Sequence, residues 1–468
     1  MQLRVKGVCC STILLMLLGL AHSTLAQNAP STPAITAPFT PEASLAGTKC
    51  GGGTPDSPAC TAPYPMLSKG HPVDWWFVFK FNASTFSGCS VGATRACPFG
   101  GDPFAYKSFG QQFAYASSEA PTLQQGAGCA GVTGASTAAP VSAPAPATDP
   151  IGATFEQVYN GAFHYVVWND QFYQDPPIKT CSGNGCDEPW GHSKGLVAWN
   201  DAGEGLVMQV STPSWPASGS ARFPRKTEGN TLGCLKKDDN IEVSQHFFAL
   251  RLSKADLMAV LAALGNSSVV TDAANAQVVS NGGPPEVQQL VAKLGQRSTS
   301  TALMTTVLSS GVELISKPSQ LPVPPWQLVS SVLGGVSLRV ASWWDTPQIY
   351  STTATTAIAC WSPSLASLPK PGAVEIALSG QWAGKPIGLS GGSGPNFNHA
   401  KLGVSTSGDK RYAIFGDMNQ QGAIAGPKCD RSQDGRGGMF FVMVHPQLAD
   451  SIASLITGTS APTEAPAK

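Results

Sequence analysis

Two histidine–lysine pairs carry the clearest chemical signal in this sequence. The pattern His-x-Lys occurs as His192 with Lys194 and again as His399 with Lys401. An imidazole can act as a nucleophile or as a general acid or base, and a lysine ammonium can stabilise charge on phosphoryl oxygens. Two such pairs in one site could cleave a phosphodiester bond, and this chemistry requires no cofactor and no metal ion.

The second pair lies in a segment that reads as a β-strand. Side chains alternate between the two faces of a strand, so over His399–Ser405 the histidine and the lysine share one face and the apolar side chains cover the other. A Ser-Gly-Asp turn leads to a second apolar run, Tyr412–Phe415. That run predicts a strand which delivers three residues beside the pair: Gly416, Asp417 and Asn419.

The first pair is followed by the same arrangement. The stretch GHSKGLVAWN begins a β-like run, and a turn and a second run, Gly205–Ser211, come after it. The two pairs lie about half the chain apart, which is the spacing of a duplicated unit. Spacing alone leaves open the alternative of two unrelated surface histidines on strands.

Seven stretches, in order, resemble the deoxyribonuclease II family, the acid endonuclease branch of the phospholipase D superfamily. They lie between Cys60 and His445 and read HPVDWWFVFK, FAYASSE, VVWNDQ, GHSKG, GNTLGC, NHAKLGVS and GDMN. The resemblance implies an α/β (mixed) phospholipase D-like fold with two pseudo-symmetric halves, each a central mixed β-sheet flanked by helices. It also implies a metal-independent nuclease that acts on double-stranded DNA with an acidic pH optimum.

The resemblance also assigns candidate site residues. The catalytic set is His192, Lys194, His399, Lys401 and Asn419. In each half, a third residue is expected to hold the phosphate together with the histidine and the lysine, and two departures from the superfamily pattern leave its identity open. Ser211 to Ser214 stand where the superfamily has a phosphate-holding Asn, and Asp417 replaces the small hydroxyl residue of the usual GSxN. Three further residues lie in the family-like stretches: Asp74, Asn169 and Asp170. They could position DNA or active-site groups, and the alternative is a buried hydrogen-bonding role in the fold.

The expected mechanism uses the two imidazoles in different roles. One attacks phosphorus to form a phosphohistidine, the other protonates the departing 5′ oxygen, and water then releases a 3′-phosphate. We expect His192 to be the nucleophile and His399 the acid, although pseudo-symmetry supports the reverse almost equally. The rival functions are a phospholipase D-type phosphodiesterase acting on lipid and a catalytically inactive DNA-binding or adhesion protein.

The composition excludes a strongly basic nucleic-acid binder, because the chain has 29 basic and 29 acidic residues. DNA binding then depends on local clusters of basic residues. The alternative is that these residues are only solvent-exposed charges on loops. The candidates are Arg222, Arg225 and Lys226 after the first site, and Lys428, Arg431 and Arg436 after the second. Histidines gain charge below their ordinary pKa of about 6.5, so DNA binding should strengthen as the pH falls.

The beginning of the chain reads as a secretory signal over residues 1–26, with basic residues before a short apolar run. An exported, periplasmic or secreted protein is expected, or one of a lysosome-like compartment in a eukaryote. Expected boundaries are a disordered leader over 27–58, a first half over 59–265 with a low-complexity insert over 131–150, a second half over 266–458 and a disordered tail over 459–468.

Twelve cysteines are present, and two of them, Cys9 and Cys10, fall in the expected signal. The even number that remains predicts disulfides in an exported protein. A local bond between Cys181 and Cys186 is favoured over a zinc site with His192, because no fourth ligand follows at metal-site spacing. The family resemblance suggests one long-range pair, Cys60 with Cys234, and a second expected pair is Cys360 with Cys429.

The rest of the pattern mixes strands with helices. Expected strands are Val73–Lys80, Phe163–Trp168, Lys194–Trp199, Gly205–Val210, His246–Leu250, Val312–Ile315, Ser337–Trp343, Ala373–Leu378 and Gly438–Val444. Ser253 and Asp256 predict a capped helix that ends at Gly265, and further helices are expected over Glu286–Leu294 and Gln447–Ile456. A GxSxG match at Gly388–Gly392 is interpreted as a flexible loop, because no strand-to-helix elbow surrounds it.

Overall fold

Two large β-sheets organise the part of the chain that the computed structural model describes, namely residues 62–86, 112–127, 130, 149–181, 185–213, 215, 220, 222–223 and 242–463. The first sheet is antiparallel throughout and has the order β10 (Val279–Ser280), β6 (His164–Asn169), β7 (Lys194–Trp199), β8 (Gly205–Val210), β9 (Gln245–Leu252), β3 (Trp75–Lys80), β4 (Phe113–Ser117) and β5 (Gln124–Gln125).

The second sheet repeats this plan. Its order is β11 (Met304–Val307), β12 (Glu313–Lys317), β19 (Gly438–Val444), β18 (Tyr412–Gly416), β17 (Leu402–Ser405), β13 (Leu338–Ala341) and β14 (Val374–Ile376). It is mixed, because β13 and β14 run parallel. Two small hairpins accompany the sheets: β1 (Met66–Ser68) with β2 (His71–Pro72), and β15 (Ser379–Trp382) with β16 (Lys385–Gly388).

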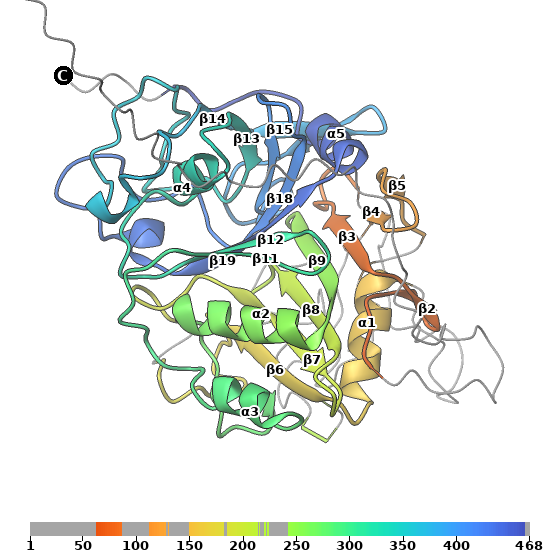
Figure 1. The fold of residues 1–468 in the computed structure, drawn as a ribbon. Coiled ribbons are helices and arrows are strands. Elements are labelled where there is room, and N and C mark those ends of the chain that lie inside the picture. Colours follow the sequence, from red (N-terminus) through yellow and green to blue (C-terminus); the bar gives the residue numbers. More distant parts are fainter. Residues whose placement is uncertain are drawn as a thin grey trace, which may run out of the picture. The chain divides into compact units, whose positions relative to one another are not determined.

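The two sheets, most of whose strands are labelled in Figure 1, are related by their strand order and register. Reading across each sheet, β6-β7-β8-β9-β3 corresponds to β13-β17-β18-β19-β12. Lys80 at the end of β3 lies opposite Gln245, just as Lys317 at the end of β12 lies opposite Gly438. The expected α/β (mixed) fold with two pseudo-symmetric halves is therefore confirmed. The expectation of a mixed sheet in each half is correct for the second half and wrong for the first, whose sheet is antiparallel because every strand in it pairs with an antiparallel neighbour.

Helices occupy matching places in the two halves. Helix α1 (Pro150–Tyr159) precedes β6 as α4 (Pro325–Val332) precedes β13, and α2 (Lys254–Asn266) follows β9 as α5 (Pro446–Leu455) follows β19. Helix α3 (Pro285–Val291) has no such counterpart among the described helices, and two short 3₁₀ turns, η1 (Pro363–Leu365) and η2 (Ser432–Gly435), lie in loops of the second half. Helix α2 begins with the predicted capping box, in which Ser253 and Asp256 exchange hydrogen bonds.

The inner faces of the sheets meet in a cluster of phenylalanines. The ring of Phe248 in β9 stacks on that of Phe415 in β18 with 4.3 Å between centroids, and Phe77 and Phe441 complete the cluster. Neighbouring strand residues face the opposite way, so Phe247 contacts Trp215 beneath α1 and Phe440 contacts Trp326 of α4. Each half thus has its sheet between the shared aromatic core and an outer helix.

Several sequence expectations need correction. Strand β10 pairs with β6, so the first half extends beyond residue 265. Ser460 and Thr463, expected in a disordered tail, instead form β-bridges with Ala377 and Ser351. The GxSxG segment begins in a strand that the sequence did not predict, β16, and no helix elbow follows it.

Other expectations have different outcomes. The Cys181–Cys186 and Cys360–Cys429 disulfides are present, whereas the Cys60–Cys234 pair, the leader and the 131–150 insert lie outside the described residues. No helix in the described ranges is long and apolar enough to cross a membrane.

Candidate functional site

Both His-x-Lys pairs lie at the same end of their sheets. In the first sheet this end carries Lys194 at the start of β7, Asn169 at the end of β6, Ser211 just after β8 and Lys80 at the end of β3. The corresponding end of the second sheet carries Lys401 just before β17, Asp417 just after β18 and Lys317 at the end of β12. Antiparallel hairpins make this possible, because one strand starts where its neighbour stops.

Each catalytic candidate histidine is attached to the opposite half of the molecule. The backbone N–H of His192 donates to the carbonyl oxygen of Gly437 at 2.8 Å, and that of His399 donates to the carbonyl oxygen of Ser244 at 2.8 Å. Gly437 directly precedes β19 and Ser244 directly precedes β9, and these two strands occupy equivalent places in their sheets. This reciprocal pair of bonds brings the two His-x-Lys segments into one candidate site.

The expected strand His399–Ser405 is too long at its beginning. Residues 399–401 precede β17, which starts at Leu402. The backbone N–H groups of His399 and Lys401 bind the first half, at the Ser244 carbonyl oxygen and at Nδ1 of His246. They therefore do not join a ladder within their own sheet.

His192 has a defined tautomer. Its Nδ1 lies 2.7 Å from the backbone carbonyl oxygen of Asp417. Because a carbonyl only accepts, Nδ1 carries the hydrogen and Nε2 keeps a lone pair. Burial first, and the charge of Lys194 second, lower the pKa of His192 well below its ordinary value, so the imidazole is neutral.

Lys194 is held by a buried ionic network. Its Nζ lies 2.6 Å from Oδ1 of Asp170, and Nη2 of Arg436 lies 2.9 Å from the other carboxylate oxygen. Burial alone would raise the pKa of Asp170, but Lys194, His192 and Arg436 outweigh it and leave the pKa below its ordinary value. Asp170 is therefore an anion that orients Lys194.

Arg436 corrects a sequence expectation. It was expected as a DNA-binding loop charge, yet its guanidinium also donates to the carbonyl oxygens of Trp190, Cys186 and Gly191. Its side chain is 8 % exposed. All these contacts are internal, so Arg436 joins the two halves behind the site.

Asp417, whose backbone carbonyl oxygen bonds to His192, is buried. Its carboxylate accepts from the backbone N–H of Met439 at 2.9 Å and from Nε2 of Gln209 at 3.0 Å. Burial nevertheless outweighs these donors and raises the pKa of Asp417 to about 7. Asp417 can therefore gain a proton in the acidic range.

The second pair has different surroundings. Nζ of Lys401 donates to the carbonyl oxygen of His399 at 2.5 Å, and the Trp343 ring meets the His399 imidazole edge-on with centroids 4.4 Å apart. Trp343 follows β13 at the position that Asp170 holds after β6. Burial and then the positive charges of Lys401, Lys194 and Lys80 lower the pKa of His399 well below its ordinary value.

Two further buried lysines were missed from the sequence. Lys80 is fully buried and its charge reaches His399. Its equivalent, Lys317, donates to the carbonyl oxygens of Asp434 and Arg436 at 2.8 and 2.7 Å, which fixes the turn η2. A lysine that ends an apolar strand is the only signal of either in the sequence, WFVFK and ELISK.

The turn η2 links Lys317 to the remaining candidate of the second half. Oε1 of Gln433, in that turn, accepts from the backbone N–H of Asn419 at 3.1 Å, and the Asn419 side chain donates to Gln421 at 2.8 Å. Burial lowers the pKa of the Lys317 ammonium and raises that of the neighbouring Asp434 carboxyl.

Two first-half candidates are buried in hydrogen-bonded positions. Ser211 donates to Oε1 of Gln245 at 2.6 Å and accepts from the backbone N–H of His246 at 2.8 Å. Asn169 donates to the carbonyl oxygen of Trp215 at 3.0 Å and accepts from the backbone N–H of Gln171 at 2.8 Å. Both therefore brace the site end of the first sheet.

Other candidates lie elsewhere. Asp74 is exposed before the opposite end of β3 and pairs with Arg251, so it does not join the site. Arg222 lies beside Tyr165, near the far end of β6. Lys428 and Arg431 are exposed on a loop, and Ser214, Arg225 and Lys226 lie outside the described residues.

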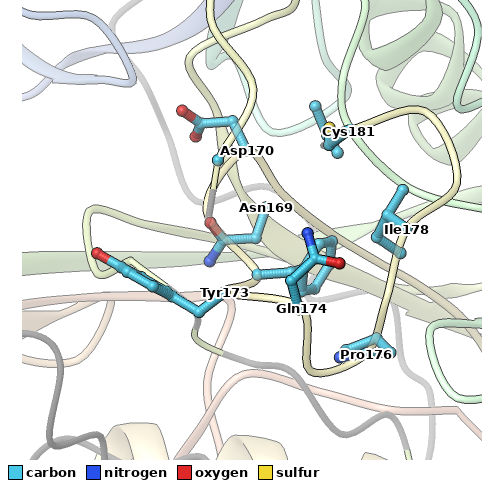
Figure 2. A pocket seen from close by; sticks show the side chains of 10 residues that line it. Asn169, Asp170, Tyr173, Gln174, Pro176, Ile178 and Cys181 are labelled. Carbon is cyan, nitrogen blue, oxygen red and sulfur yellow. The ribbon is translucent and has the colours of Figure 1, made fainter. Parts of the chain in front are cut away.

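A pocket opens behind Asn169 and Asp170 (Figure 2). Its lining includes Tyr173 and Gln174, whose φ angles of 55° and 64° are in the left-handed region. Such angles are costly for residues other than glycine. The Cys181–Cys186 disulfide closes one side of this loop.

The same disulfide decides against the alternative of a zinc site made by Cys181, Cys186 and His192. That alternative is wrong because both thiols are used in the disulfide. Within the described ranges, no three His, Cys, Asp or Glu side chains are placed to share a metal ion.

Comparison with protein-family models finds a match, described as Deoxyribonuclease II, over residues 65–356. This is more than half of the 468 residues. The matched range contains His192 and Lys194 and ends before His399. No curated protein matches the chain.

Proposed function

Because the chain belongs to the deoxyribonuclease II family, whose members are hydrolases that cut phosphodiester bonds of DNA, we propose that it is an acid endodeoxyribonuclease with a single site built from both halves. The reciprocal bonds of His192 to Gly437 and of His399 to Ser244 carry this proposal. They give the part of the second half that lies beyond the matched range, with His399 and Gly437, the same relation to the site as the matched first half.

The proposed reaction has two steps and uses no metal. Nε2 of His192 attacks phosphorus, the bond from phosphorus to the 5′ oxygen breaks, and His399 gives that oxygen its proton. Water then attacks the phosphohistidine, loses a proton to His399 and leaves a 3′-phosphate end while His192 is regenerated. Lys194 and Lys401 stabilise the charge on the non-bridging oxygens, and Asn419 adds an amide donor.

The role of His192 as nucleophile is supported by its tautomer. The Asp417 carbonyl oxygen holds Nδ1–H, so the lone pair lies on Nε2, and burial keeps the ring neutral. Asp417 and Ser211, expected as substrate contacts, instead support the site structurally, since their side-chain oxygens bond to other residues. The acid role then falls to His399.

Substrate and location follow from the same proposal. Double-stranded DNA is the proposed substrate. Large exposed hydrophobic side chains among the described residues are Val307 in β11, Val444 in β19 and Tyr350 in a loop, and this set offers no acyl-binding surface for the lipid alternative. The two disulfides among the described residues fit an oxidising compartment, so we propose an exported or lysosome-like location.

The test is cleavage of plasmid DNA at pH 5 in excess EDTA. The wild type should cut, His192→Ala and His399→Ala should not, and Lys194→Ala and Lys401→Ala should each lose about 10²-fold or more, as when one oxyanion donor is removed. His164→Ala is the matched control, because His164 pairs with Asp201 at the other end of β6. Loss of wild-type cleavage in EDTA that magnesium restores would overturn the proposal.

A further inference from the structure

His246 is a third histidine at the junction of the two halves, and the reaction proposed above does not use it. It lies in β9 and is fully buried. Its Nδ1 accepts a hydrogen bond of 3.1 Å from the backbone N–H of Lys401. Resting on the function proposed above, we propose that His246 is a positioning residue, whose imidazole fixes the Lys401 backbone and so places His399 and Lys401 together at the scissile phosphate.

The need for a side-chain acceptor follows from the strand pairing. Residues 398–401 run parallel to the start of β9: Ser244 bridges to Asn398, and the His399 N–H binds the Ser244 carbonyl oxygen. A continued parallel ladder would bring the Lys401 N–H to the carbonyl oxygen of His246. That carbonyl already accepts from the N–H of Ser211 at 3.1 Å. The imidazole supplies the missing acceptor instead.

The residue type agrees with this role. To accept at Nδ1 the ring must be neutral, and burial first and the charge of Lys401 second lower the pKa of His246 well below its ordinary value. The hydrogen then lies on Nε2, which has no hydrogen-bond partner among the described residues. A buried donor without a hydrogen-bond partner destabilises the folded state. An apolar residue would pack at lower cost, and the equivalent position of the second half indeed holds one, Met439.

The test compares two substitutions that both remove the ring. His246→Leu keeps an apolar side chain of similar size but no acceptor, whereas His246→Asn can place its amide oxygen near the position of Nδ1. A displaced catalytic group can cost about 10²-fold in rate. We expect kcat on plasmid DNA to fall by about that factor in His246→Leu, with a smaller change in KM, and His246→Asn to recover at least about tenfold of the loss.

Phe248→Leu is the matched control. Phe248 is two residues along the same strand, equally buried, and packs in the aromatic core, so its truncation should lower the unfolding midpoint while kcat changes less than about threefold. A kcat for His246→Leu equal to that of Phe248→Leu, or no difference between Leu and Asn at position 246, would overturn the proposal.

If His246→Leu does not fold, His246→Gln replaces it, because its longer chain carries the amide oxygen past the Nδ1 position; equal kcat for Asn and Gln is then the contrary result. Failure of the nuclease proposal is separate. It would appear as EDTA-sensitive wild-type cleavage, or as activity in His192→Ala or His399→Ala.

Discussion

Asp417→Asn should change how the free energy of unfolding depends on pH. Asp417 is 4 % exposed, and burial raises the pKa of its carboxyl group to about 7 from an ordinary value of 3.8. The folded protein therefore holds a proton on Asp417 over a range where the unfolded chain has lost it. This stabilisation is complete below the unfolded pKa and is lost as the pH rises through about 7.

The size of the effect follows from these two pKa values. Proton linkage gives about 3 kcal/mol more stabilisation from Asp417 at pH 5 than at pH 8. Asparagine has no proton to exchange, so the free energy of unfolding of the wild type minus that of the variant should fall by about this amount between the two pH values. Buried histidines such as His192 are present in both proteins, so their contributions largely cancel.

The assay is urea unfolding of both proteins at pH 5 and pH 8, with disulfides intact and ionic strength fixed. Both linear extrapolations should keep the same slope. A difference between wild type and variant that stays constant, or that grows in favour of the wild type as pH rises, would refute the account of Asp417.

Two further predictions concern charge and protonation. Asp170→Asn leaves the buried cations of Lys194 and Arg436 without their anion, so unfolding by urea should show a loss of about 3–5 kcal/mol; an unchanged midpoint would contradict the buried network. The pH profile of kcat/KM should be bell-shaped with a maximum below about 6.5, because burial lowers the pKa of both His192 and His399; a maximum at pH 8 or above at fixed ionic strength would reject the acid-nuclease assignment.

Local sequence pattern was sufficient for parts of this molecule. The predicted bounds are correct for three strands, Lys194–Trp199, Gly205–Val210 and Gly438–Val444. Each of these strands is an alternating or continuous apolar run between turn residues, so the local sequence is enough to predict where it begins and ends. The Ser253 cap was equally local. The doubled His-x-Lys pattern likewise identified the end of each sheet at which the candidate site lies.

The features of the site that could not be predicted from the sequence depend on contacts between the two halves. Arg436 looked like loop charge, since its partner Asp170 is 266 residues away. Lys80 and His246 carry no motif, and their relation to the second pair exists only once β9 and β3 meet residues 399–401. For the same reason the His399 segment was interpreted as strand, because its bonds to Ser244 and His246 cross between the halves.

The central claim, one site with His192 as nucleophile and His399 as acid, is tested most directly by covalent capture. The p-nitrophenyl ester of thymidine 3′-phosphate has a leaving group that requires no protonation, so His399→Ala should still allow the first step while slowing the second. In EDTA at pH 5, this variant should release about one equivalent of nitrophenol in a burst and carry the nucleotide on His192, as mapped by mass spectrometry. A nucleotide adduct in His192→Ala, or no adduct on His192 in His399→Ala, would contradict the account.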